Sequence, residues 1–264
     1  DGYTLPAGCH TGISGGGRMQ RDGEPPAVGG KIAGIFSRNA VMNPRNHRHF
    51  LAVWIDKCLS ALVILLTGAH SQPLPHLRVR AAAGRVFYAN HNSHGDFMLI
   101  WVSLPRLLRR QLRPVAAADY WLKSPLRRFI ALKVFNMVLV ARQSGEPQAA
   151  VLQMAEAMDA GADLLIFPEG TRNANDNVLL QPFKSGLYHL AMARPECELV
   201  PVWIHNIQRV LPKGRLLPVP MLCSVRFGQP FRGGDFPEKE DFLAFAQATL
   251  LALQPVLRQE ERGL

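Results

Sequence analysis

A histidine and an aspartate stand five residues apart in the polar segment Asn90-His91-Asn92-Ser93-His94-Gly95-Asp96. If this segment turns back on itself, the Asp96 carboxylate can bond to one nitrogen of the His91 imidazole and fix its tautomer. The other ring nitrogen is then free to take a proton from a substrate hydroxyl. The pair can therefore perform general-base chemistry without a serine or cysteine nucleophile.

Three other interpretations of this segment stay open from the residues alone. His91, His94 and Asp96 could bind a metal ion, although their spacing is uncommon in hydrolases and no other cluster offers further ligands. Ser93 could be a nucleophile, but it lacks the Gly-x-Ser-x-Gly turn that exposes such a serine. The segment could also be a plain polar turn in which Asp96 caps the next helix.

A second polar segment, Phe167-Pro168-Glu169-Gly170-Thr171-Arg172, follows an apolar run. Gly170 permits a close approach of the backbone to a ligand, and Arg172 can bind a phosphate through two parallel hydrogen bonds. Glu169 can bind hydroxyls or position that arginine. Alone, this segment is a weak signal, because salt bridges at strand ends are common.

The elements that would position both segments alternate between strands and helices. Strands are predicted at 85–90, 114–118, 137–141, 163–167, 199–204 and 221–227. Helices are predicted at 46–67, 96–112, 124–135, 144–160 and 235–259, the last with Asp235 and Glu238 at capping-box spacing. Pro105 is expected to kink the helix at 96–112 or to start a new one. This alternation predicts an α/β fold, a single layered domain with a mostly parallel central sheet flanked by helices. Ligands in such sheets bind beyond the carboxyl ends of the strands, where both polar segments begin.

The chain of 264 residues is predicted to hold one domain. A flexible, glycine-rich tail is expected at 1–42 and the domain at 43–264, with a helix at 43–70, a catalytic core at 80–230 and a closing helix at 235–264. Four scattered cysteines without a Cys-x-x-Cys pair exclude a zinc ribbon and a dense disulfide framework. A reduced, cytosol-facing location is expected.

The charge and the first predicted helix both bear on partners. A formal charge of +10 favours anionic partners. The uncharged part of the helix, 58–67, is too short to span a membrane, so the helix is either buried or lies in a membrane interface with Trp54 at headgroup depth. Between residues 106 and 133, eight cations stand among apolar residues and Asp119 is the only acid. This stretch suits an anionic bilayer surface or an ordinary solvated face, and no nucleic-acid motif accompanies it.

Together the segments resemble those of the glycerolipid acyltransferase family. The family's Asn-His-x-Ser-x-x-Asp motif is matched at 90–96, and its Phe-Pro-Glu-Gly-Thr-Arg motif at every position of 167–172. Weaker matches lie at 138–142, 183–186 and 200–202, and the resemblance covers roughly residues 48–230. At two positions where the family often has a glycine and an acidic residue, this chain has Asn136 and Ala141, which weakens the alignment of Arg142.

The resemblance implies an acyltransferase with a fold like that of glycerol-3-phosphate acyltransferase. His91 would be the base and Asp96 its partner, with no acyl-enzyme. The remaining implied residues would shape or charge the pocket for an acceptor phosphate: Arg142, Glu169, Gly170, Thr171, Arg172 and Lys184. No cofactor or metal is implied, only acyl-CoA or acyl-carrier protein as co-substrate.

The expected reaction is transfer of a fatty acyl chain to a lysophospholipid, above all 1-acylglycerol 3-phosphate, giving phosphatidate at the cytoplasmic face of a membrane. The alternatives are glycerol 3-phosphate or another lysolipid as acceptor, a catalytically silent lipid-binding protein, or a hydrolase that cleaves the thioester with water. The expected partners are an anionic membrane surface, the acceptor and the thioester donor, and no nucleic acid.

Overall fold

A seven-stranded sheet forms the centre of the computed structural model, which describes residues 50–69, 74–77, 81–93, 95–141, 147–173, 175, 178–206 and 222–255. The first five strands are parallel, and β6 and β7 run antiparallel to β5. The order is β3 (Val138–Val140), β2 (Leu112–Ala117), β4 (Asp163–Ile166), β1 (Arg85–Ala89), β5 (Glu198–His205) and β6 (Ser224–Phe227), with β7 (Phe231–Arg232) also on β5. The mostly parallel sheet predicted from the alternation is confirmed.

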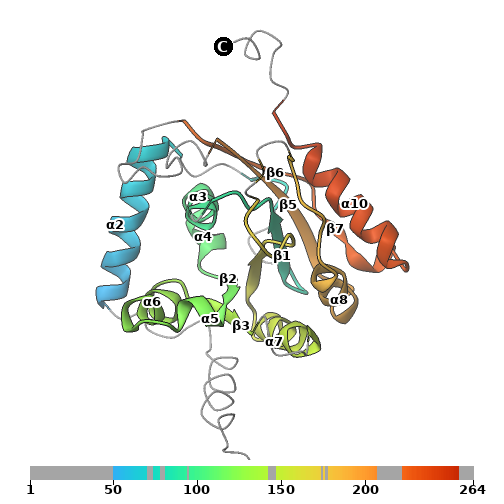
Figure 1. Ribbon diagram of the computed structural model, residues 1–264, viewed down its shortest axis with the longest axis horizontal. Coiled ribbons are helices and arrows are strands. Elements are labelled where there is room, and N and C mark those ends of the chain that lie inside the picture. The colour runs from blue at the N-terminus through green and yellow to red at the C-terminus, as the bar shows by residue number, and fades with distance from the viewer. Residues whose placement is uncertain are drawn as a thin grey trace, which may run out of the picture.

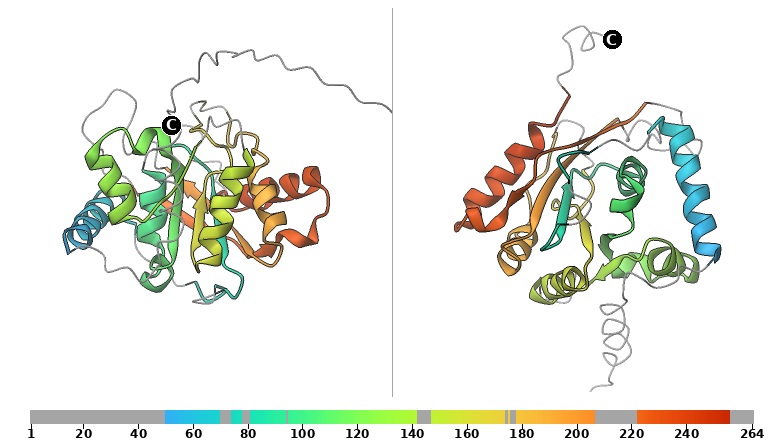
Figure 2. Two further views of the ribbon diagram at one scale, coloured as in Figure 1. Left: turned by 90° about the horizontal axis from the view of Figure 1, so that it is seen from below. Right: turned by 180° about the vertical axis from the view of Figure 1, so that it is seen from behind.

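Helices cover both faces of the sheet (Figures 1 and 2). Phe87 and Ala89 of β1 join one apolar core, and Val86 and Tyr88 join the other, as the alternation of side chains along a strand requires. The first core is covered by α2 (Phe50–Thr67), α3 (Asp96–Ser103), α4 (Arg106–Arg109), α5 (Ala118–Trp121), α6 (Pro125–Phe129) and the π-helix η1 (Ile130–Val134). The second is covered by α7 (Pro147–Asp159), α8 (Gly186–Ala193) and α10 (Lys239–Leu251).

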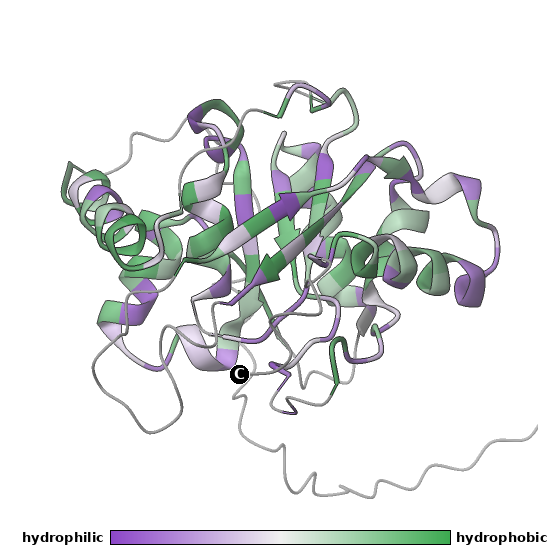
Figure 3. Ribbon diagram, turned by 90° about the horizontal axis from the view of Figure 1, so that it is seen from above, coloured by the Kyte–Doolittle hydropathy of each residue, from purple (hydrophilic) through white to green (hydrophobic). Residues whose placement is uncertain are grey.

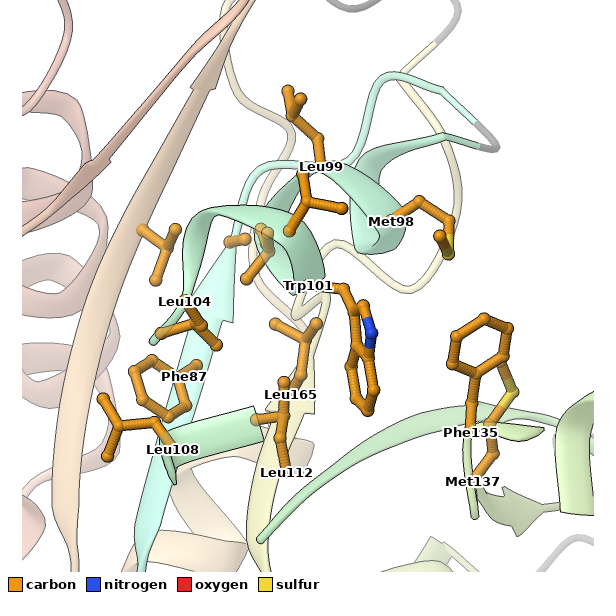
Figure 4. Packing of buried hydrophobic residues seen from close by; sticks show 14 of the residues in the cluster. Phe87, Met98, Leu99, Trp101, Leu104, Leu108, Leu112, Phe135, Met137 and Leu165 are labelled. Atoms are coloured by element: carbon orange, nitrogen blue, oxygen red, sulfur yellow. The ribbon is translucent and has the colours of Figure 1, made fainter. Parts of the chain in front are cut away.

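Helix α2 is fixed to the domain through the first core. Trp101 of α3 packs edge-on against Phe135 (Figure 4), with ring centroids 5.3 Å apart. Its Nε1 donates a 2.8 Å hydrogen bond to Asp56 Oδ1 of α2. The acid of α2 therefore faces the protein, together with residues at helical spacing that pack on the core: Ala52, Ile55, Leu59, Val63 and Leu66.

The opposite face of α2 is apolar and exposed. Phe50 and Leu65 are 77% and 78% exposed, and Leu51, Trp54 and Leu62 are exposed as well. The hydrophobic character of α2 is visible in Figure 3. Within the described residues, α2 alone is long and apolar enough, by length and composition, to cross a membrane. Its uncharged part, 58–67, is by itself too short to do so, which is why the sequence predicted no membrane span. Helix α2 lies alongside the domain, packed on one face and bare on the other.

A buried cation joins three strands at the amino edge of the sheet. The Arg85 side chain is fully buried and donates from Nε and Nη2 to Glu198 Oε2 at 3.0 and 2.8 Å. Its Nη1 lies 3.7 Å from Asp163 Oδ2. Since Asp163, Arg85 and Glu198 begin β4, β1 and β5, this network ties the strands together at the edge away from the polar segments.

Several predicted helix bounds were wrong. The helix predicted at 96–112 ends at Ser103, because Pro105 disfavours helical geometry at Leu104, which is extended. The break expected at Pro105 is confirmed, since a new helix, α4, begins directly after it. The closing helix begins at Lys239, and the predicted capping box is wrong. Pro237 keeps Phe236 extended, so Asp235 ends a separate 3₁₀ turn, η2 (Gly233–Asp235). The tail at 1–42, residues 46–49 and Ser144 lie outside the described residues.

The basic stretch is not one continuous surface. Arg113 is buried in β2, its Nε donates to the Asn136 carbonyl, and burial lowers its pKa. Arg109 is half-buried, and its Nε donates to the Leu104 carbonyl. The six remaining cations of the stretch are exposed: Arg106, Arg110, Lys123, Arg127, Arg128 and Lys133.

Candidate active site

The two polar segments meet at the carboxyl edge of the sheet. Strands β1 and β4 are parallel neighbours, so the segments that follow them leave the sheet side by side. The His91 ring stacks on the Phe167 ring, with centroids 4.2 Å apart and planes 20° apart. Phe167 was noted only as part of its motif, and its role as a platform for the imidazole is a finding of the structure.

His91 and Asp96 form the pair that their spacing permits. His91 Nδ1 lies 2.8 Å from Asp96 Oδ2. The same oxygen accepts from the N–H groups of Asn92 at 2.6 Å and Ser93 at 2.9 Å. A carboxylate held by two main-chain donors places the ring proton on Nδ1 and leaves Nε2 with its lone pair. The Asp96 side chain is 1% exposed and the His91 side chain 20%, so the pair opens to solvent on the histidine side only.

The other interpretations of this turn can be compared with its geometry. Asp96 is the first residue of α3, but its carboxylate accepts from the preceding loop, and Gly95 occupies the N-cap. The Ser93 hydroxyl accepts from the Gly95 N–H at 3.2 Å, a contact within the turn. His94 lies outside the described residues. Asp96 therefore holds the histidine and its loop, which a plain capping aspartate would not do.

Glu169 of the second segment forms a hydrogen bond to the main chain of the first segment. Its side chain is buried, and its Oε1 accepts from the His91 N–H at 2.7 Å while Oε2 accepts from the Gln181 N–H at 2.9 Å. The His91 carbonyl in turn accepts from the Asn173 N–H at 2.6 Å. Burial raises the pKa of the Glu169 carboxyl, and the Gln181 and His91 donors oppose part of that rise. Glu169 thus shapes the site by fixing the main chain of His91.

Asn90 anchors the start of the first segment to the sheet. Its buried side chain donates from Nδ2 to the Ile204 carbonyl at 3.0 Å and accepts on Oδ1 from the Ile204 N–H at 2.8 Å. These two bonds imitate the pairing of a backbone group with β5 at the point where β1 ends. His91 therefore follows directly on a fixed residue.

Most residues assigned to the phosphate pocket belong to the second segment, which bonds to the main chain of His91 through Glu169. Gly170 has φ +72°, and a Cβ there would come within 2.8 Å of Lys184 Cδ, so the lysine stem lies directly over the glycine. Thr171 Oγ1 donates to Gln181 Oε1 at 3.3 Å. The Arg172 side chain is exposed and bonds to no side chain in the described ranges. Arg142 lies outside the described residues.

Comparisons with known proteins give the family and the fold of the chain. The sequence profile of the family described as Acyltransferase matches residues 73–205, which include both polar segments. One solved structure with a similar fold is the 1-acyl-sn-glycerophosphate (LPA) acyltransferase PlsC from Thermotoga maritima. It is 17% identical, with a TM-score of 0.58, and the match covers 89% of this chain and 90% of that one. No curated protein sequence matches the chain.

The histidine–aspartate pair at the carboxyl edge of the sheet lies within the residues that the acyltransferase profile matches. The chain belongs to the Acyltransferase family.

Proposed function

We propose that the protein transfers a fatty acyl chain from a thioester donor to the free hydroxyl of 1-acylglycerol 3-phosphate, giving phosphatidate. The observation that carries this proposal is the 2.8 Å bond from His91 Nδ1 to Asp96, with Nε2 left for a substrate. The solved relative is titled an acyltransferase of 1-acyl-sn-glycerophosphate, which supports the choice of acceptor.

The reaction follows from the state of the imidazole. His91 Nε2 takes the proton of the acceptor hydroxyl as its oxygen attacks the thioester carbonyl. The positive charge that develops on the ring lies next to the Asp96 carboxylate, which stabilises it. When the tetrahedral intermediate collapses, the C–S bond breaks, the thiolate leaves and takes the proton from His91. The ester forms directly, without an acyl-enzyme, and general-base catalysis of this kind contributes about 10²- to 10⁴-fold.

The acceptor phosphate is proposed to bind at the second segment. Arg172 is exposed, and no side chain of the described residues occupies its guanidinium, so two hydrogen bonds to a phosphate are available. Lys184 lies over Gly170 and adds a second cation on the same loop system. Arg142 is proposed as a further phosphate ligand on the family resemblance alone.

The enzyme is proposed to work at the cytoplasmic face of a membrane, with acyl-CoA or acyl-carrier protein as donor and no cofactor. The exposed apolar face of α2 suits insertion into one leaflet, because Trp54 and Lys57 stand on it as interfacial residues do. Asp56, the acid of α2, is bonded on the protein side and does not oppose insertion.

The test is acyl transfer from labelled long-chain acyl-CoA in mixed micelles. Lysophosphatidate, glycerol 3-phosphate and zwitterionic lysolipids are compared, with His91→Ala as the blank. We expect product with lysophosphatidate and none with the variant. Product from another acceptor alone would overturn the substrate, and equal activity of His91→Ala would overturn the mechanism. If no acceptor gives product with either acyl-CoA or acyl-carrier protein, a silent lipid-binding protein is the better account.

A further inference from the structure

A hollow of about 510 Å³ opens between the turn that precedes α6 and the π-helix η1. Three cations line it, Lys123 from the turn, Arg128 from α6 and Lys133 from η1. Leu122, Phe129 and Leu132 form its apolar wall. None of the residues assigned to the active site lines this hollow, so the acyl-transfer chemistry leaves it without a role.

The charge of the hollow is uncompensated. Lys123, Arg128 and Lys133 are all exposed, and no acid lines the hollow. In the described ranges, none of the three forms an ion pair. Three cations that line one concave site repel each other, and a bound anion relieves that repulsion. The site is therefore complementary to a compact group with more than one negative oxygen, such as a phosphate.

The π-helix brings the third cation to the hollow. In η1 the Phe135 N–H bonds to the Ile130 carbonyl at 3.1 Å, a five-residue step in place of the four of an α-helix. Arg128 and Lys133 would stand about 140° apart on a regular α-helix, and here both line one site. Single π-turns of this kind often mark functional sites.

The apolar wall of the hollow favours a lipid over a free anion as the bound group. Phe129 and Leu132 pack against the same core as Ile55 and Leu59 of α2, the helix proposed to enter the membrane. Figures 1 and 2 show α6 beside the N-terminal end of α2. Leu126 of α6 is 67% exposed, and the exposed aromatic residues of α2, Phe50 and Trp54, belong to the N-terminal half of that helix. An anion with attached acyl chains fits this setting better than a soluble one.

We propose that this hollow binds the phosphate headgroup of an anionic phospholipid and so holds the protein on the membrane at a second lipid site. The proposal rests on the membrane association proposed above. The headgroup phosphate would lie among Lys123, Arg128 and Lys133, with its acyl chains passing Leu126 toward the exposed face of α2.

The experiment measures sedimentation of the full chain with vesicles of phosphatidylcholine, with and without phosphatidylglycerol. The test variant is K123Q/R128Q/K133Q, and the matched control R106Q/R110Q/R127Q removes three exposed cations of the same stretch from outside the hollow. At about 1 kcal/mol per cation near a bilayer, we expect the test variant to bind the anionic vesicles about 100-fold more weakly. We expect the control to lose less than about tenfold, because in this proposal its three cations bind no headgroup and contribute only an attraction that salt screens. A charge-preserving K123R/R128K/K133R variant should bind like the wild type.

Equal losses in the test and control triples would overturn the proposal in favour of a diffuse basic surface. Release of the wild type by inorganic phosphate, at constant ionic strength, would overturn it in favour of a free-anion site. A test variant that binds vesicles normally, but loses transfer from acyl-carrier protein only, would reassign the hollow to an acidic protein.

Acyl transfer in detergent micelles separates this proposal from the proposed function. We expect the test variant to keep full activity there. If the wild type transfers no acyl chain in micelles but the vesicle results hold, the proposed reaction fails and the lipid site stands.

Discussion

Asp96→Asn changes the charge of the histidine–aspartate pair while it keeps the hydrogen bonds. All three donors of this turn, His91 Nδ1–H and the N–H groups of Asn92 and Ser93, bond to the same oxygen of Asp96. The other oxygen is buried and, within the described residues, has no partner. An asparagine can therefore place its carbonyl oxygen where Oδ2 stands and its amide NH₂ where Oδ1 stands. The main-chain donors favour this orientation, so His91 keeps its tautomer.

The expected loss of activity then comes from charge alone. A hydrogen bond to a charged partner contributes about 1.5–3 kcal/mol, and a neutral one about 0.5–1.5 kcal/mol. Two opposite charges about 4 Å apart near a protein surface attract by about 4 kcal/mol, which sets the upper limit. We take the lost stabilisation of the imidazolium as about 2–3 kcal/mol, which lowers kcat by about 30- to 160-fold. The buried amide NH₂ adds a stability loss of about 1–3 kcal/mol.

The assay is the single-turnover rate of acyl transfer with saturating acceptor, together with urea unfolding of each variant. Asp119→Asn, which removes an exposed acid of α5, is the matched control and should change neither quantity. A rate loss as large as that of His91→Ala would show that the asparagine has turned and that the shared oxygen does not fix the tautomer. An unchanged rate would show that the Asp96 charge does not act on the reaction.

Three further predictions concern other residues. Arg172→Ala should raise the KM for a phosphorylated acceptor by about 10- to 100-fold through loss of two charged hydrogen bonds, and an unchanged KM would remove Arg172 from the phosphate site. Glu169→Ala leaves the His91 and Gln181 N–H groups without an acceptor, so urea unfolding should show a loss of about 2–6 kcal/mol, and a loss below 1 kcal/mol would contradict this role of Glu169. Burial raises the pKa of Cys223 to about 11, so near pH 8 only about one thousandth of it is thiolate and iodoacetamide should leave it unmodified while it labels exposed Cys58. Anionic vesicles should protect Cys58, and equal labelling with and without vesicles would show that α2 does not enter the membrane.

The sequence predicted much of the fold because its strands are short apolar runs separated by polar turns. The order of strands and helices needs only periodicity, and both polar segments were placed at the carboxyl edge on that basis. Helix ends were less predictable, because Pro105 and Pro237 act through the residues before them. The break at Pro105 was expected, but the helix bound at 112 was wrong, because β2 begins there, and the capping box at Asp235 was wrong as well.

The candidate site was predictable where one side chain acts on another nearby in the chain. The spacing of His91 and Asp96 was enough to suggest their contact. Contacts that depend on the main chain of a distant segment were not predictable, such as the two N–H groups that bond to Glu169. Stacking of Phe167 on His91 likewise depends on the pairing of β1 with β4, which residue types do not encode.

The main chain of His91 is bonded on both sides, through its N–H to Glu169 and through its carbonyl to the Asn173 N–H. A surface loop ordinarily exchanges its amide hydrogens quickly, but we expect these two amides to exchange slowly, because their hydrogen bonds break only when the two segments separate. The base is therefore held in position before any substrate arrives. The conformational entropy of ordering it is lost when the chain folds, so substrate binding need not order it again.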